Sequence, residues 1–270
     1  MSARYPERIV CLTEESTETL YLLGEERRIV GISGYTVRPP RARREKPRVS
    51  AFLSARTDKI LELRPDLVIG FSDLQADIAR ELAKAGLNVL ISNQRSVQEI
   101  FNTILMLASL VGAAEKGQRL VAKLEENLDD IRSATRGFER RPKVYFEEWD
   151  EPMISAIRWV SELIEIAGGE EIFSDRSHSH AATGRIVSAQ EVLERKPEVI
   201  LGSWCGKKFR PERMAARAGW RELPAVRDNY LFEIKSADIL QPGPAALTDG
   251  VRRIHELLRD SVSRAARRRS

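Results

Sequence analysis

The chain has 270 residues, of which 42% are hydrophobic and 31% are charged, and its formal net charge is +4. This length suffices for two compact α/β units of roughly 100–130 residues each. The charge excess is small and lies partly in the terminal stretch 264–270, so nucleic-acid binding is not expected. Cys11 and Cys205 are far apart and lack metal-ligand spacing. We therefore expect no disulfide framework, and reduced thiols fit a cytoplasmic compartment.

The first residues, MSARYPERIVCL, contain neither a long apolar segment nor a small-residue cleavage site. No apolar run is long enough to span a bilayer. As given, the sequence predicts a soluble cytoplasmic protein. If a signal segment was removed and replaced by Met1, the protein is periplasmic instead, and both interpretations stay open.

Short apolar runs alternate with helical patterns through residues 1–114. The expected strands are 8–12, 29–32, 67–70 and 89–91. The expected helices are 17–23, 57–63, 75–85 and 97–111. The stretch 37–46 has paired prolines and several basic residues, and is expected to be an exposed loop. The alternation predicts a mostly parallel sheet with helices on both faces.

Residues 115–138 have a different pattern. Leu120, Leu124, Leu128 and Ile131 form one apolar stripe in a highly charged segment. This predicts one helix of about six turns, roughly 35 Å long, which would connect the lobes 1–114 and 139–270 rigidly. The second lobe is expected to contain strands 144–147, 198–202 and 230–234, and helices 159–167, 188–195 and 246–259.

Residues 60–70 (ILELRPDLVIG) and 192–202 (VLERKPEVILG) are nearly the same sequence. Four residues recur identically: Leu61 as Leu193, Glu62 as Glu194, Pro65 as Pro197 and Gly70 as Gly202. Each copy has the form of a helix end, a proline, an acidic residue and a buried strand. Two such copies predict two similar α/β lobes with a cleft between them, and ligands favour clefts of that kind.

Several stretches, in this order, resemble the helical-backbone class of ABC-transporter substrate-binding proteins, which includes cobalamin, ferric-siderophore and haem binders. They are RIVCLTEESTETLYLLG, VGISGY, TDKILELRPDLVIG, SELIEIAGGEEIF, IVSAQEVLERKPEVILGS, the W-x-x-L-P-A-V pattern at 220–226, and GPAALTDGVRRIHELL. The resemblance covers roughly residues 6–260. It implies two Rossmann-like lobes joined by a single long helix, with a largely preformed ligand cleft between them.

The resemblance also implies a permease-docking position on each lobe. In the first lobe this position is Asp58, which keeps the acidic character of the family. In the second lobe it is Gln190, with Glu191 beside it. An ABC permease is therefore an optional partner, and a monomer is expected.

Ligands of open α/β sheets bind beyond the carboxyl ends of the strands, which selects the loops after each strand. In the first lobe these loops contain Thr13, Glu14 and Glu15, then Tyr35, then Phe71. By resemblance, Tyr35 matches a family position that often touches ligand. Its ring could stack on a ligand, its phenol could bind a metal, or it could only pack at the rim.

In the second lobe the segment 202–209 (GSWCGKKF) is the most unusual candidate. Trp204 offers a flat surface for a planar ligand, and Lys207 and Lys208 could meet carboxylates. Cys205 lies between them. The competing interpretation is a surface loop with a buried tryptophan.

Two further candidates precede this segment. Trp149 lies in the acidic stretch 147–151, which could bind a cation or form a solvated turn. Arg158 lies at the start of a helix expected to face the cleft, and arginine suits bidentate recognition of carboxylates. The adjacent Trp159 is expected to pack in the core.

His178 and His180 form an H-x-H pair within a loop. Direct binding of zinc or manganese needs three or four converging ligands, of which this pair supplies two. The histidines could instead ligate the metal of a bound chelate. A flexible loop without a metal role is the favoured interpretation.

The leading hypothesis is a non-enzymatic binding protein for a metal chelate: a corrinoid, ferric siderophore or haem-like compound. The cobalt or iron chelate would be a ligand, and no cofactor is required. One alternative is a cytoplasmic enzyme or cofactor-handling protein that uses Cys205 or the carboxylates of 147–151. Another is direct binding of a free divalent metal.

Overall fold

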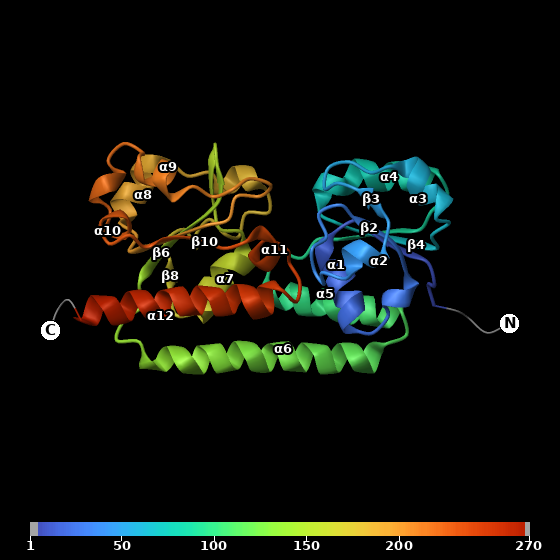
Figure 1. The fold of residues 1–270 in the computed structure, drawn as a ribbon, viewed down its shortest axis with the longest axis horizontal. Coiled ribbons are helices and arrows are strands. Elements are labelled where there is room, and N and C mark those ends of the chain that lie inside the picture. Colours follow the sequence, from blue (N-terminus) through green and yellow to red (C-terminus); the bar gives the residue numbers. More distant parts are fainter. Residues whose placement is uncertain (1–4, 268–270) are drawn as a thin grey trace. The chain divides into compact units, whose positions relative to one another are not determined.

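The structure is a computed structural model that describes residues 5–267 (Figure 1). The chain forms two compact units. The first contains Met1–Gln94, Gln98–Leu124 and Pro242–Pro244, and the second contains Arg95–Val97, Glu125–Gln241 and Ala245–Ser270. None of the helices within residues 5–267 combines the length and apolar character that crossing a membrane requires.

The predicted long helix is confirmed as α6 (Ala114–Ala134), which has 21 residues and is followed by a 3-10 turn. Residues of this helix contact both units. Leu120 packs against the core of the first unit, whereas Asn127, in the second unit, donates a 2.8 Å hydrogen bond to the carbonyl of Leu247. The boundary between the units therefore falls inside this helix.

The first unit is built on a five-stranded parallel sheet, as the sequence predicted, with the strand order β3-β2-β1-β4-β5. Its strands are β1 (Ile9–Cys11), β2 (Ile29–Ser33), β3 (Arg48–Ser50), β4 (Leu67–Phe71) and β5 (Val89–Ser92). This is a Rossmann-type order, in which the chain reverses direction across the sheet between β1 and β4. The sequence pattern missed β3, because Val49 is its single buried residue.

Helices cover both faces of this sheet. They are α1 (Glu14–Leu22), α3 (Thr57–Glu62), α4 (Ala76–Lys84) and α5 (Val97–Leu110). Ile9 and Cys11 of β1 pack in the core under α1 and α5, while Val10 and Leu12 pack under α3 and α4. The two-residue alternation of a strand explains this division. Burial raises the pKa of the Cys11 thiol to about 12, which agrees with an inert core role.

The expectation of an exposed loop over 37–46 was partly wrong, because the segment contains the short helix α2 (Ala42–Glu45). Ala42 is fully buried in the core near α1. The hydroxyl of Tyr21 donates a 2.7 Å hydrogen bond to Glu45, and the Arg41 guanidinium lies 4.8 Å from the Tyr21 ring centroid. A tertiary contact thus orders a segment whose composition is typical of a loop.

The second unit is built on a mixed sheet of order β10-β9-β6-β7, in which β8 also pairs with β6. Its strands are β6 (Lys143–Asp150), β7 (Met153–Ser155), β8 (Glu170–Glu171), β9 (Val199–Gly202) and β10 (Leu231–Glu233). The expected repetition of the first lobe is incomplete here. Strand β6 continues past 147 and turns back as the antiparallel strand β7.

Helices flank this second sheet on both faces (Figure 1). On one face lie α7 (Arg158–Ile166) and α12 (Val251–Arg267), which follows a π-helical turn at Ala246–Gly250. On the other lie α8 (Ala189–Arg195), α9 (Pro211–Ala215) and α10 (Pro224–Arg227), and α11 (Ser236–Ile239) follows β10. Trp220 is fully buried between Tyr145 and the helices of this second face.

The duplication seen in the sequence is present in the backbone. Arg64 and Lys196 occupy equivalent places, and both have left-handed φ values, of 45° and 50°. The next acidic residue, Asp66 or Glu198, accepts a hydrogen bond from the backbone N–H of Arg8 or Lys143 at 3.0 Å. These carboxylates therefore fix the first residues of the central strand in each unit.

The two repeated glycines are required by close approaches of side chains from the loops that follow. A Cβ on Gly70 would lie 2.6 Å from the Gln75 side-chain oxygen. A Cβ on Gly202 would lie 2.0 Å from the Phe209 ring. In each unit a side chain from the segment after the strand packs directly against the glycine, so a residue with a Cβ does not fit at either position.

We predict that Gly202→Ala destabilises the protein by about 1–3 kcal/mol, because the rigid Phe209 ring has to move out of a packed core. Urea denaturation followed by circular dichroism measures the change. Gly137→Ala is the matched control, since no atom lies within 4 Å of its added Cβ and its φ is not left-handed. Equal stabilities of the two variants would contradict this packing.

Candidate functional site

A pocket of about 280 Å³ lies at the carboxyl ends of β9 and β10, where open α/β sheets bind ligands. Its walls come from the loops after both strands. The lining residues are Ser203, Trp204, Gly206, Lys207, Lys208, Glu233, Ile234, Lys235 and Ser236. The structure thus brings three predicted residues, Trp204, Lys207 and Lys208, to one pocket. The sequence places Lys235 and Ser236 in a loop after a predicted strand, but assigns neither residue a role.

A larger pocket, of about 610 Å³, lies at the opposite, amino end of β6. Its arginines are already paired with carboxylates. Arg132 binds Asp129, Arg140 binds Glu198, and Arg141 binds Glu165. Its size alone does not make it the better candidate. A third pocket, of about 420 Å³, adjoins the 280 Å³ pocket. Acidic and basic residues line it in similar numbers, among them Asp238, Asp249, Arg252 and Arg253.

Glu147 fixes the position of the smaller pocket. Its side chain is fully buried, at the last residue of β6 that pairs with β9. Both of its oxygens accept hydrogen bonds from Arg217, at 2.6 and 2.9 Å. One oxygen also accepts from the Trp204 indole N–H at 3.0 Å, and the other from the Tyr145 hydroxyl at 2.9 Å. Burial, followed by the charge of Glu147, raises the pKa of Tyr145 well above its ordinary value.

Trp204 is consequently only 4% exposed, and its ring meets the Phe209 ring edge-on at 5.1 Å between centroids. Most of the indole belongs to the core, and its remaining surface lines the pocket. Contact between this ring and a ligand stays a prediction. Cys205, the next residue, is exposed.

Lys207 is not an independent cation, because its ammonium forms an ion pair with Asp150. The same Nζ atom lies 4.1 Å from the Trp149 ring centroid and 5.5 Å from that of Trp204. These cation–π contacts tie the loop after β9 to the β6–β7 hairpin. Lys208 is exposed, and among the described residues it forms neither an ion pair nor a cation–π contact.

The carboxyl edge of the first unit exposes several large apolar side chains. Tyr35 is 56% exposed there, as a rim residue would be, whereas Phe71 is 7% exposed. Two residues that the sequence analysis missed, Leu53 and Leu74, are 68% and 60% exposed in the loops after β3 and β4. A lone leucine in a short loop carries no sequence signal that separates surface from core.

One residue shapes this edge. Gln75 accepts a hydrogen bond from the Phe71 N–H at 3.0 Å and donates one to the Phe52 carbonyl at 2.9 Å, joining two loops. Ser72, which follows Phe71 in the chain, has φ 65° and ψ 164°, a backbone conformation that favours glycine. The serine is held there by its backbone bond to Ser92 and by a bond from Leu74 to its hydroxyl.

Glu14 and Glu15 were expected in the loop after β1 and instead form the first turn of α1. Both side chains are buried, at 7% and 3% exposed. Burial raises the pKa of each carboxyl to about 7. Glutamate is common in the first turn of a helix, which agrees with a helix that begins earlier than expected.

The remaining candidates have mainly structural partners. Arg158 pairs with Glu162 at 2.8 Å on the same helix. Asp58 and Gln190 are exposed near the starts of α3 and α8, the two repeated helices. Glu191 closes a capping box with Ser188 and also binds Arg176, so it is less available for docking than Asp58.

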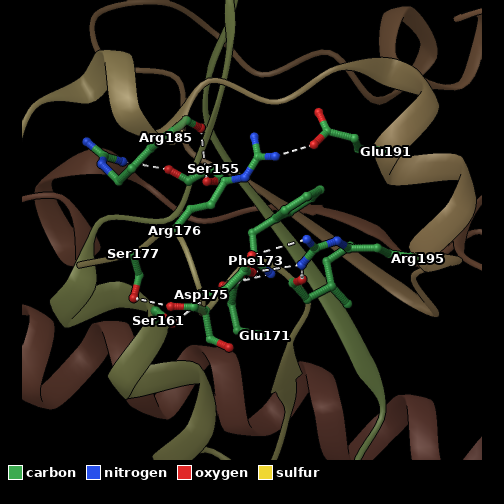
Figure 2. Close-up of polar contacts among 12 residues, drawn as sticks. Ser155, Ser161, Glu171, Phe173, Asp175, Arg176, Ser177, Arg185, Glu191 and Arg195 are labelled. Atoms are coloured by element: carbon green, nitrogen blue, oxygen red, sulfur yellow. Dashed lines mark hydrogen bonds and ion pairs between the residues drawn. The ribbon is translucent and has the colours of Figure 1, made fainter. Parts of the chain in front are cut away.

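The loop that contains His178 and His180 is anchored by arginines (Figure 2). Arg176 and Arg195 lie over the Phe173 ring at 5.7 and 4.3 Å. At the far end of the loop the buried Arg185 donates to the Ser155 carbonyl at 2.6 Å and pairs with Glu148.

Both histidines are exposed. Within residues 5–267, no group of three or more histidine, cysteine, aspartate or glutamate side chains gathers so that it could hold a metal ion.

The model of one protein family, described as periplasmic binding protein, matches residues 9–237. The chain belongs to the periplasmic binding protein family. A vitamin B12-binding protein of Vibrio cholerae is 30% identical over 252 residues, which cover 89% of this chain and 85% of that protein.

Solved structures of other periplasmic binding proteins agree. The vitamin B12-binding protein BtuF of Vibrio cholerae has a TM-score of 0.75 and 26% identity, covering 96% of this chain and 99% of that one. The haem-binding protein RhuT of Roseiflexus, at 24% identity, has a TM-score of 0.77 and covers 93% and 99%. The latter likeness concerns the fold alone.

In this periplasmic binding protein we expect Glu147→Gln to cost about 2–4 kcal/mol, because it leaves the half-buried Arg217 charge without its carboxylate. Urea denaturation measures the loss. Asp77→Asn breaks an exposed ion pair with Arg80 and should cost about 0–1 kcal/mol. A similarly small effect at Glu147 would show that the Glu147–Arg217 pair does not hold the loop.

A second prediction concerns Glu171, which is 2% exposed and has one oxygen without a hydrogen-bond partner among the described residues. Burial raises the pKa of this carboxyl from 4.5 to about 8. Between these values the unfolded chain binds fewer protons than the folded protein. Stability should therefore fall as pH rises from about 4.5 to about 8.

Glu171→Gln stays neutral and removes this loss, so its stability relative to the unmodified protein should rise by a few kcal/mol, on the order of 1.4 per pKa unit, across that range. Urea denaturation at several pH values measures the difference. Glu125→Gln is the control, because Glu125 is exposed on α6 and changes surroundings little on unfolding. A pH-independent difference for Glu171→Gln would refute the assignment.

Proposed function

We propose that this protein binds a metal chelate, a corrinoid, ferric siderophore or haem-like compound, at the carboxyl edges of its sheets. The observation that carries the proposal is the pocket after β9 and β10, where Trp204, Lys208 and Lys235 meet. This pocket places cations beside the exposed part of an indole, and so suits one polar substituent of a large conjugated ligand whose ring lies outside it.

Two further observations support a chelate. The apolar rim of the first unit, with Tyr35, Leu53 and Leu74 exposed, suits the face of a macrocycle. In addition, the relative of 30% identity is named for vitamin B12 binding. The ligand is cargo in this proposal, and no cofactor is needed.

A binding role accounts for the carboxylates of 147–151 better than an enzymatic one. Glu147 accepts bonds from Arg217, Trp204 and Tyr145, and Asp150 pairs with Lys207, so neither is poised as a base. Catalysis by the exposed Cys205 would need a base to activate the thiol. Loss of a turnover activity in Cys205→Ala would be needed to favour the enzyme alternative.

Family membership supports delivery to an ABC permease, and Asp58 and Gln190 are the proposed docking positions. Their exposure on equivalent helices supports this role. A relative from Bacillus subtilis, at 24% identity, is named as a substrate-binding lipoprotein of an ABC transporter. We further propose a monomer that acts outside the cytoplasmic membrane.

Titration with cyanocobalamin, haemin and a ferric hydroxamate, followed by calorimetry, tests the chelate proposal. Tyr35→Ala should weaken binding of the recognised chelate by about tenfold, since a rim aromatic contributes on the order of 1–2 kcal/mol. Tyr5→Ala is the matched control, because Tyr5 is equally exposed, at 56%, but packs beside Gly112. Failure of all three chelates to bind would overturn the proposal.

A further inference from the structure

The pocket after β9 and β10 contains a buried hydroxyl that no described residue hydrogen-bonds. Ser203 is 1% exposed and lines the pocket, yet its Oγ has no hydrogen-bond partner among the described residues. Its backbone N–H is satisfied by the Glu147 carbonyl at 3.0 Å. A buried hydroxyl left unpaired costs about 1–3 kcal/mol. A donor kept at that cost is typical of a site whose partner arrives from outside.

The charges around this hydroxyl favour an anion. Lys207 is neutralised by Asp150, as described above. The other lysines of the lining, Lys208 and Lys235, are exposed and face one acidic lining residue, Glu233. Glu233 lies 3.4 Å from the Phe209 N–H, which partly occupies its carboxylate. Ser236 supplies a second hydroxyl, so most polar groups of the pocket are donors.

The volume limits what can enter. At about 280 Å³ the pocket is below the size of usual small-molecule sites, and a corrin or porphyrin ring does not fit within it. A single substituent does. Donors with a net positive charge match the oxygens of a carboxylate or phosphate, to which charge-assisted hydrogen bonds are strong.

We propose that this pocket binds an oxyanion substituent of the ligand, a carboxylate or a phosphate, through Ser203, Lys208 and Lys235. The inference rests on the proposed function and makes it narrower. Chelates that carry a free oxyanion are selected over those in which it is esterified or absent. Lys207 serves the pocket indirectly, by fastening the loop to Trp149 and Asp150.

Two pairs of probes separate the sources of the oxyanion. Haemin against its dimethyl ester tests a carboxylate, and cyanocobalamin against dicyanocobinamide, which lacks the nucleotide phosphate, tests a phosphate. The unmodified protein should bind the oxyanion member of one pair at least tenfold more tightly. Lys235→Met and Lys208→Met should each reduce that ratio several-fold, whereas Lys84→Met, an exposed lysine on α4, should leave it unchanged.

Ser203→Ala gives a sharper readout, because its two effects have opposite signs. Removing an unpaired buried hydroxyl should leave the thermal midpoint of the free protein unchanged or raised. The same change should weaken binding of the oxyanion probe about five- to tenfold while leaving its neutral counterpart unaffected. A serine with a purely structural role would lower the midpoint and affect both probes alike.

The outcomes distinguish the two proposals. If a chelate binds but the paired probes bind equally, or Ser203→Ala and Lys235→Met leave the ratio unchanged, the oxyanion site is wrong and the binding function stands. If none of the four probes binds and the ferric hydroxamate does not bind either, the chelate proposal is wrong. In that case phosphorus NMR of inorganic phosphate decides the site: line broadening that Lys235→Met abolishes supports it, and unchanged lines refute it.

Discussion

The carboxyl edge of the second unit depends on the ion pair between the buried Glu147 and the half-buried Arg217. Taking a charge fully out of water costs several kcal/mol, and the cost is smaller for Arg217, whose side chain stays 19% exposed. Four hydrogen bonds to the carboxylate, at about 1.5–3 kcal/mol each, are of the same order, so the pair adds little net stability. The consequence of the pair is geometric. The Trp204 indole N–H donates to the Glu147 carboxylate, and this bond fixes the start of the loop after β9.

The two units use one backbone plan for different surfaces. In both, an acidic residue clasps the start of the central strand, a residue with left-handed φ precedes it, and a glycine closes the edge. The next position then diverges. The first unit places Phe71 there and exposes Leu53 and Leu74 in the loops after β3 and β4, whereas the second places Ser203 in a pocket lined by lysines. Duplication thus supplies the scaffold, and single substitutions at equivalent positions give each edge its chemistry.

The elements that the sequence predicted well are those with long or repeated apolar patterns, such as α6, β4 and β9. Strands β3, β7 and β8 were missed, since two or three residues carry no usable period. At the site, the sequence pattern identified Lys207 and Lys208 as candidates but not which of them is paired with a carboxylate. Pairing of Lys207 with Asp150, and burial of Trp204 against a glutamate 57 residues away, are tertiary facts. An unpaired Ser203 hydroxyl leaves no trace in a sequence.

The state of each lysine changes how the segment 202–209 recognises a ligand. If Lys207 were free, the loop would present a diffuse positive charge, and screening by salt would leave it little selectivity. With Lys207 bound to Asp150 and between two indoles, the loop is stiff, and recognition passes to groups deeper in the pocket. A buried hydroxyl discriminates more strongly than a surface charge, because a ligand without a matching acceptor leaves the hydroxyl unpaired in the complex as well. The pocket is therefore built to select for a hydrogen-bond acceptor, and the lysines determine that the acceptor is anionic.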